Sequence, residues 1–387
     1  MSFNFDFKSA KSCLKFAPVL FSVLILTGCA PRGMLTLDPS AVVVGDVSTI
    51  FVGTTRAIDP AVGLYGSERS ETVQYSRFDV SIPPDRELGE ITWPKRGGKP
   101  NPSRDFVTTR AVQFTSGQAF ANDLQISINA PNNPQREAVI FVHGFNTTFS
   151  EGLYRLAQLS HDLEMPGTIV HYSWPSNANA LGYVHDRDSA LFARDGLEQL
   201  ISEVKAAGAQ HIYLVAHSMG STLAMESLRQ IAISKDVSLM DTIDAVALIS
   251  PDIDVDVFRT QALSIGPLLP NPFVIFGSEK DFYLGLSGRL TGEKERLGNL
   301  TDVTRLADLK VTYFDVSNYS EGAGHFNLGD SPTLIRLFDR VLDVSTALNG
   351  DQRNRVGLLP GVILTVRNAT QVVLAPVVIV GDELRRR

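Results

Sequence analysis

Residues 212–220, Ile-Tyr-Leu-Val-Ala-His-Ser-Met-Gly, decide the fold of this chain. The apolar run 212–215 is typical of a buried β-strand, and Ser218 follows it between the small residues Ala216 and Gly220. In a G-x-S-x-G turn, small residues let the backbone bend sharply from strand to helix and hold the serine out of the sheet as a nucleophile. Ala216 stands where that pattern has glycine. The alternative is that Ser218 only caps the following helix.

A nucleophilic serine needs a base, and His325 is the one histidine that follows Ser218 in the sequence. It lies in the glycine-rich segment 321–327, just after the strand-like run 310–316. An imidazole on a loop at the carboxyl end of a strand can take a proton from the serine and return it to the leaving group. We therefore predict that His325 is the general base, although a lone loop histidine can also be a plain surface residue.

An acid between Ser218 and His325 completes the order Ser, Asp, His along the chain. Asp281 follows the strand-like run 271–277 and is the first candidate. Asp252, after the run 244–250, is the alternative acid, and it could instead cap the next segment or line the pocket. Either carboxylate would orient the imidazole and stabilise its cation.

A second turn is expected upstream, where the strand-like run 137–142 ends in His-Gly-Phe-Asn, 143–146. Gly144 allows the backbone to turn its amides inward. The N–H groups of Phe145 and Met219 could then bind the oxyanion of a tetrahedral intermediate. The simpler alternative is an ordinary glycine turn after a strand.

These two turns resemble those of the α/β-hydrolase superfamily. Four further stretches resemble a bacterial esterase/lipase-like family of unknown physiological role: 50–56, 66–69, 80–83 and 251–254. The resemblance covers about 50–345. It implies hydrolysis of carboxylic esters without a metal or organic cofactor, and it implies no natural substrate.

From Glu137 onward, strand-like and helix-like stretches alternate, which predicts a mostly parallel sheet with helices on both faces. The site then lies at the carboxyl ends of the strands. Extra amino-terminal strands should extend the sheet at one edge. The expected segments are β-strands near 50–54, 77–82, 107–114 and 124–129, a loop over 83–104, and helices over 189–207, 218–233 and 332–347.

The amino terminus predicts export. Lys8, Lys11 and Lys15 precede the apolar segment 16–26, and Leu-Thr-Gly-Cys at 26–29 matches a bacterial lipoprotein processing site. The apolar segment is shorter than the ~20 residues of a membrane span, so we expect residues 1–28 to be a cleaved signal peptide rather than an anchor helix. Cys29 would then carry lipid.

Ala30 follows the lipidated cysteine, which suggests the outer membrane if the host is Gram-negative. Residues 29–48 form a linker, 49–350 the hydrolase domain, and 351–387 a carboxyl-terminal extension, which we expect to form extended strands. Its last residues, Arg385–Arg387, could alternatively contact anionic lipid.

Composition excludes several function classes. The formal charge is −7, and loss of three Lys and one Asp with the signal peptide leaves −9, so nucleic acid is not an expected partner. Cys13 and Cys29 leave the mature chain without a disulfide. His185 and Asp186 adjoin, but the seven histidines lack the spacing of a zinc site, and we expect no metal.

These observations predict a lipid-anchored envelope serine hydrolase that cleaves small-molecule or lipid esters through an acyl-enzyme. Esterase, lipase, thioesterase, peptidase and acyltransferase chemistry all remain open, because the pocket rather than the triad selects the acyl group. The alternative is a non-catalytic envelope lipoprotein that uses the same fold as a binding or scaffold module. The sequence does not indicate an oligomeric state.

Overall fold

A computed structural model describes residues 32–319 except 62, 96, 293 and 294, and then 325, 329, 331, 332, 335, 361–366 and 369–374. The predicted signal peptide 1–28 and Cys29 lie outside the described residues, as does all of the helix predicted over 332–347 except Pro332 and Ile335. The compact unit begins at Leu35. No helix in the described ranges is long and apolar enough to span a membrane.

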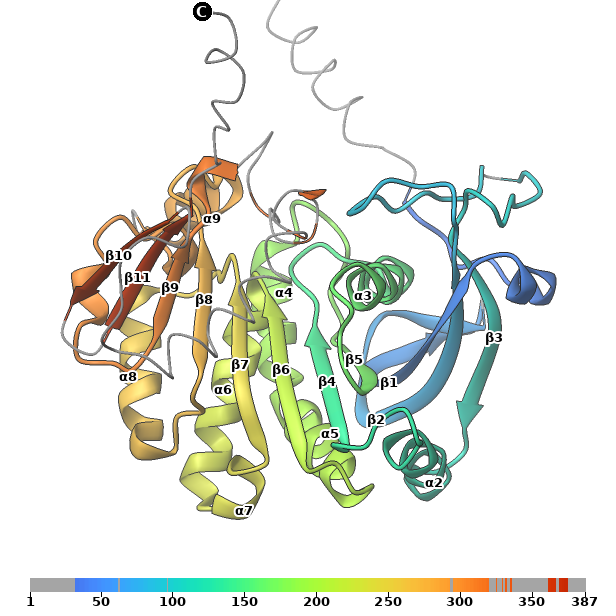
Figure 1. Ribbon diagram of the computed structural model, residues 1–387, viewed down its shortest axis with the longest axis horizontal. Helices are drawn as coiled ribbons and strands as arrows, with labels where there is room; N and C mark the ends of the chain where they lie inside the picture. The colour runs from blue at the N-terminus through green and yellow to red at the C-terminus, as the bar shows by residue number, and fades with distance from the viewer. Residues whose placement is uncertain are drawn as a thin grey trace, which may run out of the picture. The chain divides into compact units, whose positions relative to one another are not determined.

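An eleven-stranded sheet forms the centre of this unit, in the order β10-β11-β9-β8-β7-β6-β4-β5-β1-β2-β3 (Figure 1). The strands are β1 (Asp46–Asp59), β2 (Leu64–Ile82), β3 (Val107–Phe114), β4 (Glu137–Val142), β5 (Thr168–Ser173), β6 (His211–His217), β7 (Ile243–Ile249), β8 (Phe273–Gly277), β9 (Thr312–Asp315), β10 (Gly361–Val366) and β11 (Ala369–Leu374). All neighbours from β11 across to β1 pair in parallel. Antiparallel pairs flank them on both sides. The predicted mostly parallel sheet with amino-terminal strands at one edge is confirmed.

Strand β4 shows how the sheet separates two hydrophobic cores. Ala138, Ile140 and Val142 belong to one core, and Val139 and Phe141 belong to the other. Successive side chains of a strand point to opposite faces, so β4 is buried on both sides. This double burial explains why a central parallel strand appears in the sequence as a continuous apolar run.

Helices cover both faces of the sheet. They are α2 (Gly117–Ile128), α3 (Phe149–Asp162), α4 (Tyr183–Phe192), α5 (Arg194–Ala206), α6 (Met219–Ser234), α7 (Val237–Met240), α8 (Val255–Ile265) and α9 (Phe282–Thr291). Buried side chains of α2, α5, α6 and α8 belong to the first core, and those of α3 to the second. The helix predicted over 189–207 is interrupted at Ala193, whose carbonyl accepts a hydrogen bond from the Tyr172 hydroxyl (2.5 Å).

One predicted strand is wrong. Residues 124–129 alternate apolar and polar side chains, which suggested a β-strand, but they form the end of α2. Phe120, Leu124 and Ile128 repeat every four residues and are buried, whereas Ile126 is exposed. Ser116 caps the helix by accepting a hydrogen bond from the amide of Ala119. The sequence therefore contains the helical repeat of buried residues, but the exposed Ile126 gives it the apparent alternation of a strand.

Candidate active site

Ser218 occupies the turn between β6 and α6. Its backbone has φ 52° and ψ −123°, a strained conformation for a residue other than glycine. The turn is held by its amide, which donates to the carbonyl of Ile249 (2.9 Å), and by its carbonyl, which accepts from the amide of Asp252 (3.1 Å). A Cβ at Gly220 would lie 2.3 Å from the carbonyl oxygen of His143, so glycine is required for α6 to approach β4 this closely.

Ser218, His325 and Asp281 lie in one chain of hydrogen bonds. The Nε2 atom of His325 is 3.1 Å from the Ser218 hydroxyl, and its Nδ1 is 2.8 Å from Oδ2 and 3.1 Å from Oδ1 of Asp281. The Asp281 side chain is fully buried, and that of His325 is 20 % exposed. The three residues follow parallel strands, whose carboxyl ends share one edge of the sheet.

Asp281 is also built into the start of α9. It is the N-cap residue, and its Oδ1 accepts the amide of Leu284 (3.0 Å). This bond and the His325 ring hold the carboxylate in one orientation. The Tyr283 ring then packs edge-on against His325 at 5.4 Å between centroids.

Asp252, the alternative acid, is engaged elsewhere. Its buried carboxylate accepts hydrogen bonds from Arg296 Nε (2.7 Å), the Ser287 hydroxyl (2.8 Å) and the Tyr183 hydroxyl (2.9 Å). Burial and the Asp252 charge raise the pKa of Tyr183, so that this hydroxyl remains a donor. Asp252 supports the turn between β6 and α6 through its backbone amide, whereas the Asp281 side chain contacts His325.

The turn after β4 lies against Ser218. A Cβ at Gly144 would be 2.7 Å from Nδ1 of His217 and 2.9 Å from Cβ of Ser218, so only glycine fits between them. The next amide along the chain is that of Phe145. Met219 is the first residue of α6, so its amide has no partner within the helix. Met219 follows Ser218 in the chain, and Phe145 follows Gly144, which lies against Ser218.

A cavity of about 660 Å³ opens beside this turn. Its walls come from the loop after β2, from α3 and from the two turns of the site: Glu87–Ile91, Trp93, Phe141, His143, Gly144, Thr147, Glu151, Gly152, Arg155, His217 and Pro332. Apolar and charged groups both line it. Gly144 and His217, which adjoin Ser218 in space and in the chain, are part of this wall, whereas Ser218 itself is not.

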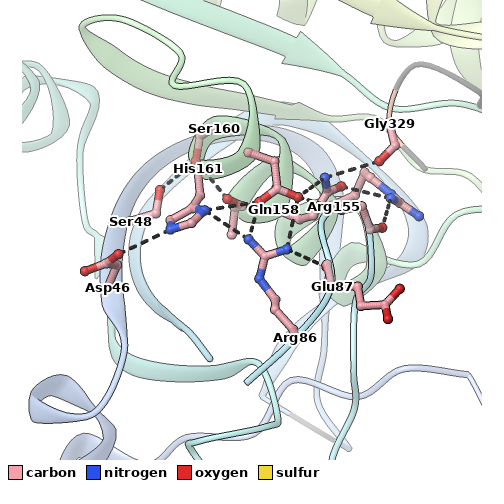
Figure 2. A network of polar contacts seen from close by, with 12 residues as sticks. Asp46, Ser48, Arg86, Glu87, Arg155, Gln158, Ser160, His161 and Gly329 are labelled. Atoms are coloured by element: carbon pink, nitrogen blue, oxygen red, sulfur yellow. Dashed lines mark hydrogen bonds and ion pairs between the residues drawn. The ribbon is translucent and has the colours of Figure 1, made fainter. Parts of the chain in front are cut away.

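A polar network holds the cavity wall on α3 (Figure 2). The buried Asp162 carboxylate pairs with Arg86 and accepts hydrogen bonds from the Gly89 amide (2.8 Å) and Gln158 Nε2 (2.8 Å). Gln158 Nε2 also donates to the carbonyl of Gly329 (3.2 Å). Burial raises the pKa of Asp162, but hydrogen bonds from His161, Arg86 and Gln158 outweigh it and hold this pKa well below its usual value.

Two contributors to the site were not predicted from the sequence. Arg56 is buried and reaches the turn after β4, and its signal in the sequence was a charged residue three positions after the apolar run 50–53. The cavity wall at 87–93 lies in the predicted loop, where nothing in the composition marked it. Within the described residues, no cluster of three or more His, Cys, Asp or Glu side chains could hold a metal ion.

Comparison with known families supports this architecture. The family described as alpha/beta hydrolase of unknown function (DUF900) matches residues 118–342, more than half of the chain. The chain belongs to this family. A 63-residue stretch is 40% identical to the uncharacterized protein alr1448 of Nostoc sp. and spans 16% of each chain.

Solved structures similar to this α/β hydrolase are remote. TT1662 from Thermus thermophilus is 13% identical over 54% of this chain and 88% of its own, with a TM-score of 0.35. Lipase B of Aspergillus fumigatus is 13% identical over 60% of this chain and 58% of its own (TM-score 0.35). Esterase 2 of Thermogutta terrifontis, phosphonylated by sarin, is 10% identical over 72% and 92% (TM-score 0.32). Such distant likeness says nothing of this chain's substrate.

Proposed function

We propose that this α/β hydrolase cleaves carboxylic esters with Ser218 as nucleophile, His325 as general base and Asp281 as the acid that orients it. The observation that carries the proposal is the unbroken hydrogen-bond chain from the Ser218 hydroxyl through both nitrogens of His325 to Asp281. A scaffold has no need of a serine in a strained turn with a base aimed at it.

The reaction follows from this order of contacts. His325 Nε2 takes the proton of Ser218 as its oxygen attacks the ester carbonyl, and the amides of Phe145 and Met219 bind the oxyanion. Asp281 holds Nδ1–H and stabilises the imidazolium. Collapse expels the alcohol, which receives the proton from His325. Water, activated by His325 in turn, then releases the acid from the acyl-enzyme.

The test is labelling of the soluble domain, beginning after Cys29, with a fluorophosphonate probe, together with turnover of p-nitrophenyl esters of rising acyl length. Ser218→Ala should lose labelling and lower turnover by several powers of ten while the melting temperature stays within a few degrees. The matched control is Ser221→Ala, since Ser221 lies one turn along α6 and its hydroxyl donates to the Ala216 carbonyl. No labelling of a folded wild-type protein would support the non-catalytic alternative.

We further propose that the enzyme is a lipid-anchored envelope protein acting on small-molecule or lipid esters. This rests on the Leu-Thr-Gly-Cys stretch at 26–29 after a short apolar segment. Several acyl chains on one residue would give a firm anchor. Expressed in a bacterium with lipoprotein processing, the full chain should partition into detergent, and Cys29→Ser should stay unprocessed and unlipidated. Lipid-free, processed wild type would contradict the anchor.

A further inference from the structure

Arg56 is a buried cation for which the proposed reaction has no direct use. It lies near the end of β1 and is 1 % exposed. Among the described residues its side chain forms hydrogen bonds with neutral groups: the Ser173 hydroxyl, the carbonyls of Gly66, Ser176 and Thr147, and the His143 ring. Burial lowers the pKa of Arg56 to about 9, against the opposing charges of Asp186 and Glu151, so the group is charged at neutral pH. Burying a cation is costly, which makes its position informative.

Two of these contacts reach the turn after β4. Arg56 Nη2 donates to the Thr147 carbonyl at 2.8 Å and lies 3.4 Å from Nε2 of His143. The same segment is also held by Asp186, which accepts a hydrogen bond from the Asn146 amide at 3.3 Å, and by the Ser176 hydroxyl, which accepts one from the Thr147 amide at 3.1 Å. The turn that carries Phe145 is thus fixed by a buried cation and a buried anion.

The His143 ring is enclosed and neutral. It stacks on Trp174 at 4.9 Å and 13°, and Trp174 Nε1 donates to the His143 carbonyl (2.7 Å). Burial, followed by the Arg56 charge, lowers the pKa of His143 well below its usual value. A neutral imidazole has one N–H, which therefore sits on either Nδ1 or Nε2.

Arg56 decides between these two forms. Nδ1 lies 2.9 Å from the Gly144 carbonyl, and Nε2 lies 3.0 Å from the Trp174 carbonyl and 3.4 Å from Arg56. The two carbonyls compete for the single N–H at nearly equal distances, and because a guanidinium only donates, the Arg56 contact favours the form in which Nε2 accepts. The N–H then sits on Nδ1 and donates to Gly144.

The Gly144 carbonyl and the Phe145 amide belong to one planar trans peptide, so they point in opposite directions. We propose that Arg56 and His143 are positioning residues of the oxyanion hole: Arg56 selects the Nδ1–H form of His143, and this N–H holds the Gly144 carbonyl back so that the Phe145 amide faces the substrate oxygen. The inference rests on the proposed ester hydrolysis and assigns a role to two residues outside the triad.

The test compares His143→Asn with His143→Gln. The Asn amide nitrogen can take the place of Nδ1 and still donate to Gly144, whereas the Gln amide reaches toward Nε2. The readout is the ratio of kcat/KM for an oxo ester and its thiono analogue, because sulfur is a poor acceptor for oxyanion-hole amides. Complete loss of one donor costs about 10²–10³ in kcat, so misaiming it in His143→Gln should lower kcat on the oxo ester by about tenfold to a hundredfold and reduce the ratio. His143→Asn should retain most of the kcat on the oxo ester and most of the oxo-to-thiono ratio.

A merely structural role would lower oxo and thiono turnover together in both variants, and that result overturns the inference while the proposed function stands. The second measurement is NMR of the histidine ring nitrogens in isotope-labelled wild type, assigned with His143→Gln. A protonated Nδ1 is expected, and a protonated Nε2 overturns the inference whether or not any ester is turned over. A wild-type protein that turns over no ester and whose Ser218 is not labelled by the probe overturns the proposed function instead.

Discussion

Asp281 and Asp252 are both buried acids near Ser218, and they differ in what their carboxylates bind. Asp281→Asn should lower kcat by about 10⁴ because an amide favours the wrong imidazole tautomer. The change should leave the melting temperature nearly unaltered, since Asn caps α9 as well as Asp does. Ester turnover and thermal unfolding of the purified variant measure both effects.

Asp252→Asn is the matched control, with the opposite expectation. It leaves Arg296 buried without its ion-pair partner, which should cost about 3–5 kcal/mol of the free energy of unfolding. Below its melting temperature the variant should keep kcat within about tenfold of wild type. Near-full activity of Asp281→Asn with an inactive, folded Asp252→Asn would assign the acid to Asp252.

The choice between these two acids shows what local sequence can and cannot predict. Ser218 was predictable because strand, turn and helix are encoded by adjacent residues. The acid was predicted as Asp281 with Asp252 left open, because nothing near Asp252 in the sequence shows that its carboxylate pairs with Arg296, which lies 44 positions along the chain. Arg56 was missed for the same reason, since its partners come from distant segments.

At the scale of elements, the approach of α6 to β4 positions Ser218. Gly220→Ala would put a Cβ 2.3 Å from the His143 carbonyl oxygen and 2.8 Å from that of Val142. The backbone must move, so we expect a loss of about 1–3 kcal/mol in stability and probe labelling slowed by about tenfold or more. Gly285→Ala in α9 is the control: its Cβ meets nothing within 4 Å, and it should stabilise by about 0.5–1 kcal/mol with unchanged labelling.

Helix α3 contributes to the cavity wall and also contacts Gly329, four residues after His325. Gln158→Met keeps the side-chain length but removes the donor to the Gly329 carbonyl and to Asp162. We expect about 1–3 kcal/mol lower stability from the unpaired buried groups and a kcat reduced by up to about tenfold. Gln125→Met, at an exposed site on α2, should change neither. An unaltered kcat in Gln158→Met would show that His325 is held by other contacts.

The elements differed in how well their sequences predicted them. β4 and β6 are central parallel strands with long apolar runs: β4 is buried on both faces, and β6 is buried on one face and half-buried on the other. α2 lies at the edge of the first core and exposes Ile126, so its short apolar alternation imitated a strand. Hydrophobic periodicity predicts an element well when its apolar side chains are all buried. It misleads when one apolar side chain, such as Ile126, is exposed and breaks the pattern.

For the whole molecule, the parallel sheet gathers every part of the site at one edge. The turn with Phe145 follows β4, Ser218 follows β6 and Asp281 follows β8, so residues far apart in sequence meet without any long-range pattern in the sequence. Three histidines in this framework, His143, His171 and His217, are kept neutral by burial, which lowers the pKa of each. Burial lowers the pKa of His171 to about 3 and, with Arg56, that of His143 well below 6.5.

These three histidines make the fold sensitive to mild acid. A histidine whose folded pKa is depressed contributes stability that is present above its unfolded pKa of 6.5 and is lost as pH falls below it, because the unfolded chain binds the proton first. Each should cost about 1.4 kcal/mol per pH unit below 6.5, before most carboxylates titrate. Urea unfolding should therefore show that the free energy of unfolding falls between pH 7 and 5. In His171→Gln the slope of this fall should be smaller by the equivalent of about one proton.

His161 serves as the control. Hydrogen bonding to Asp162 raises the pKa of His161, so its contribution to stability is complete below pH 6.5 and is lost only at higher pH. His161→Gln should leave the acid slope unchanged, and an acid slope that His171→Gln does not alter would place the sensitivity in other groups.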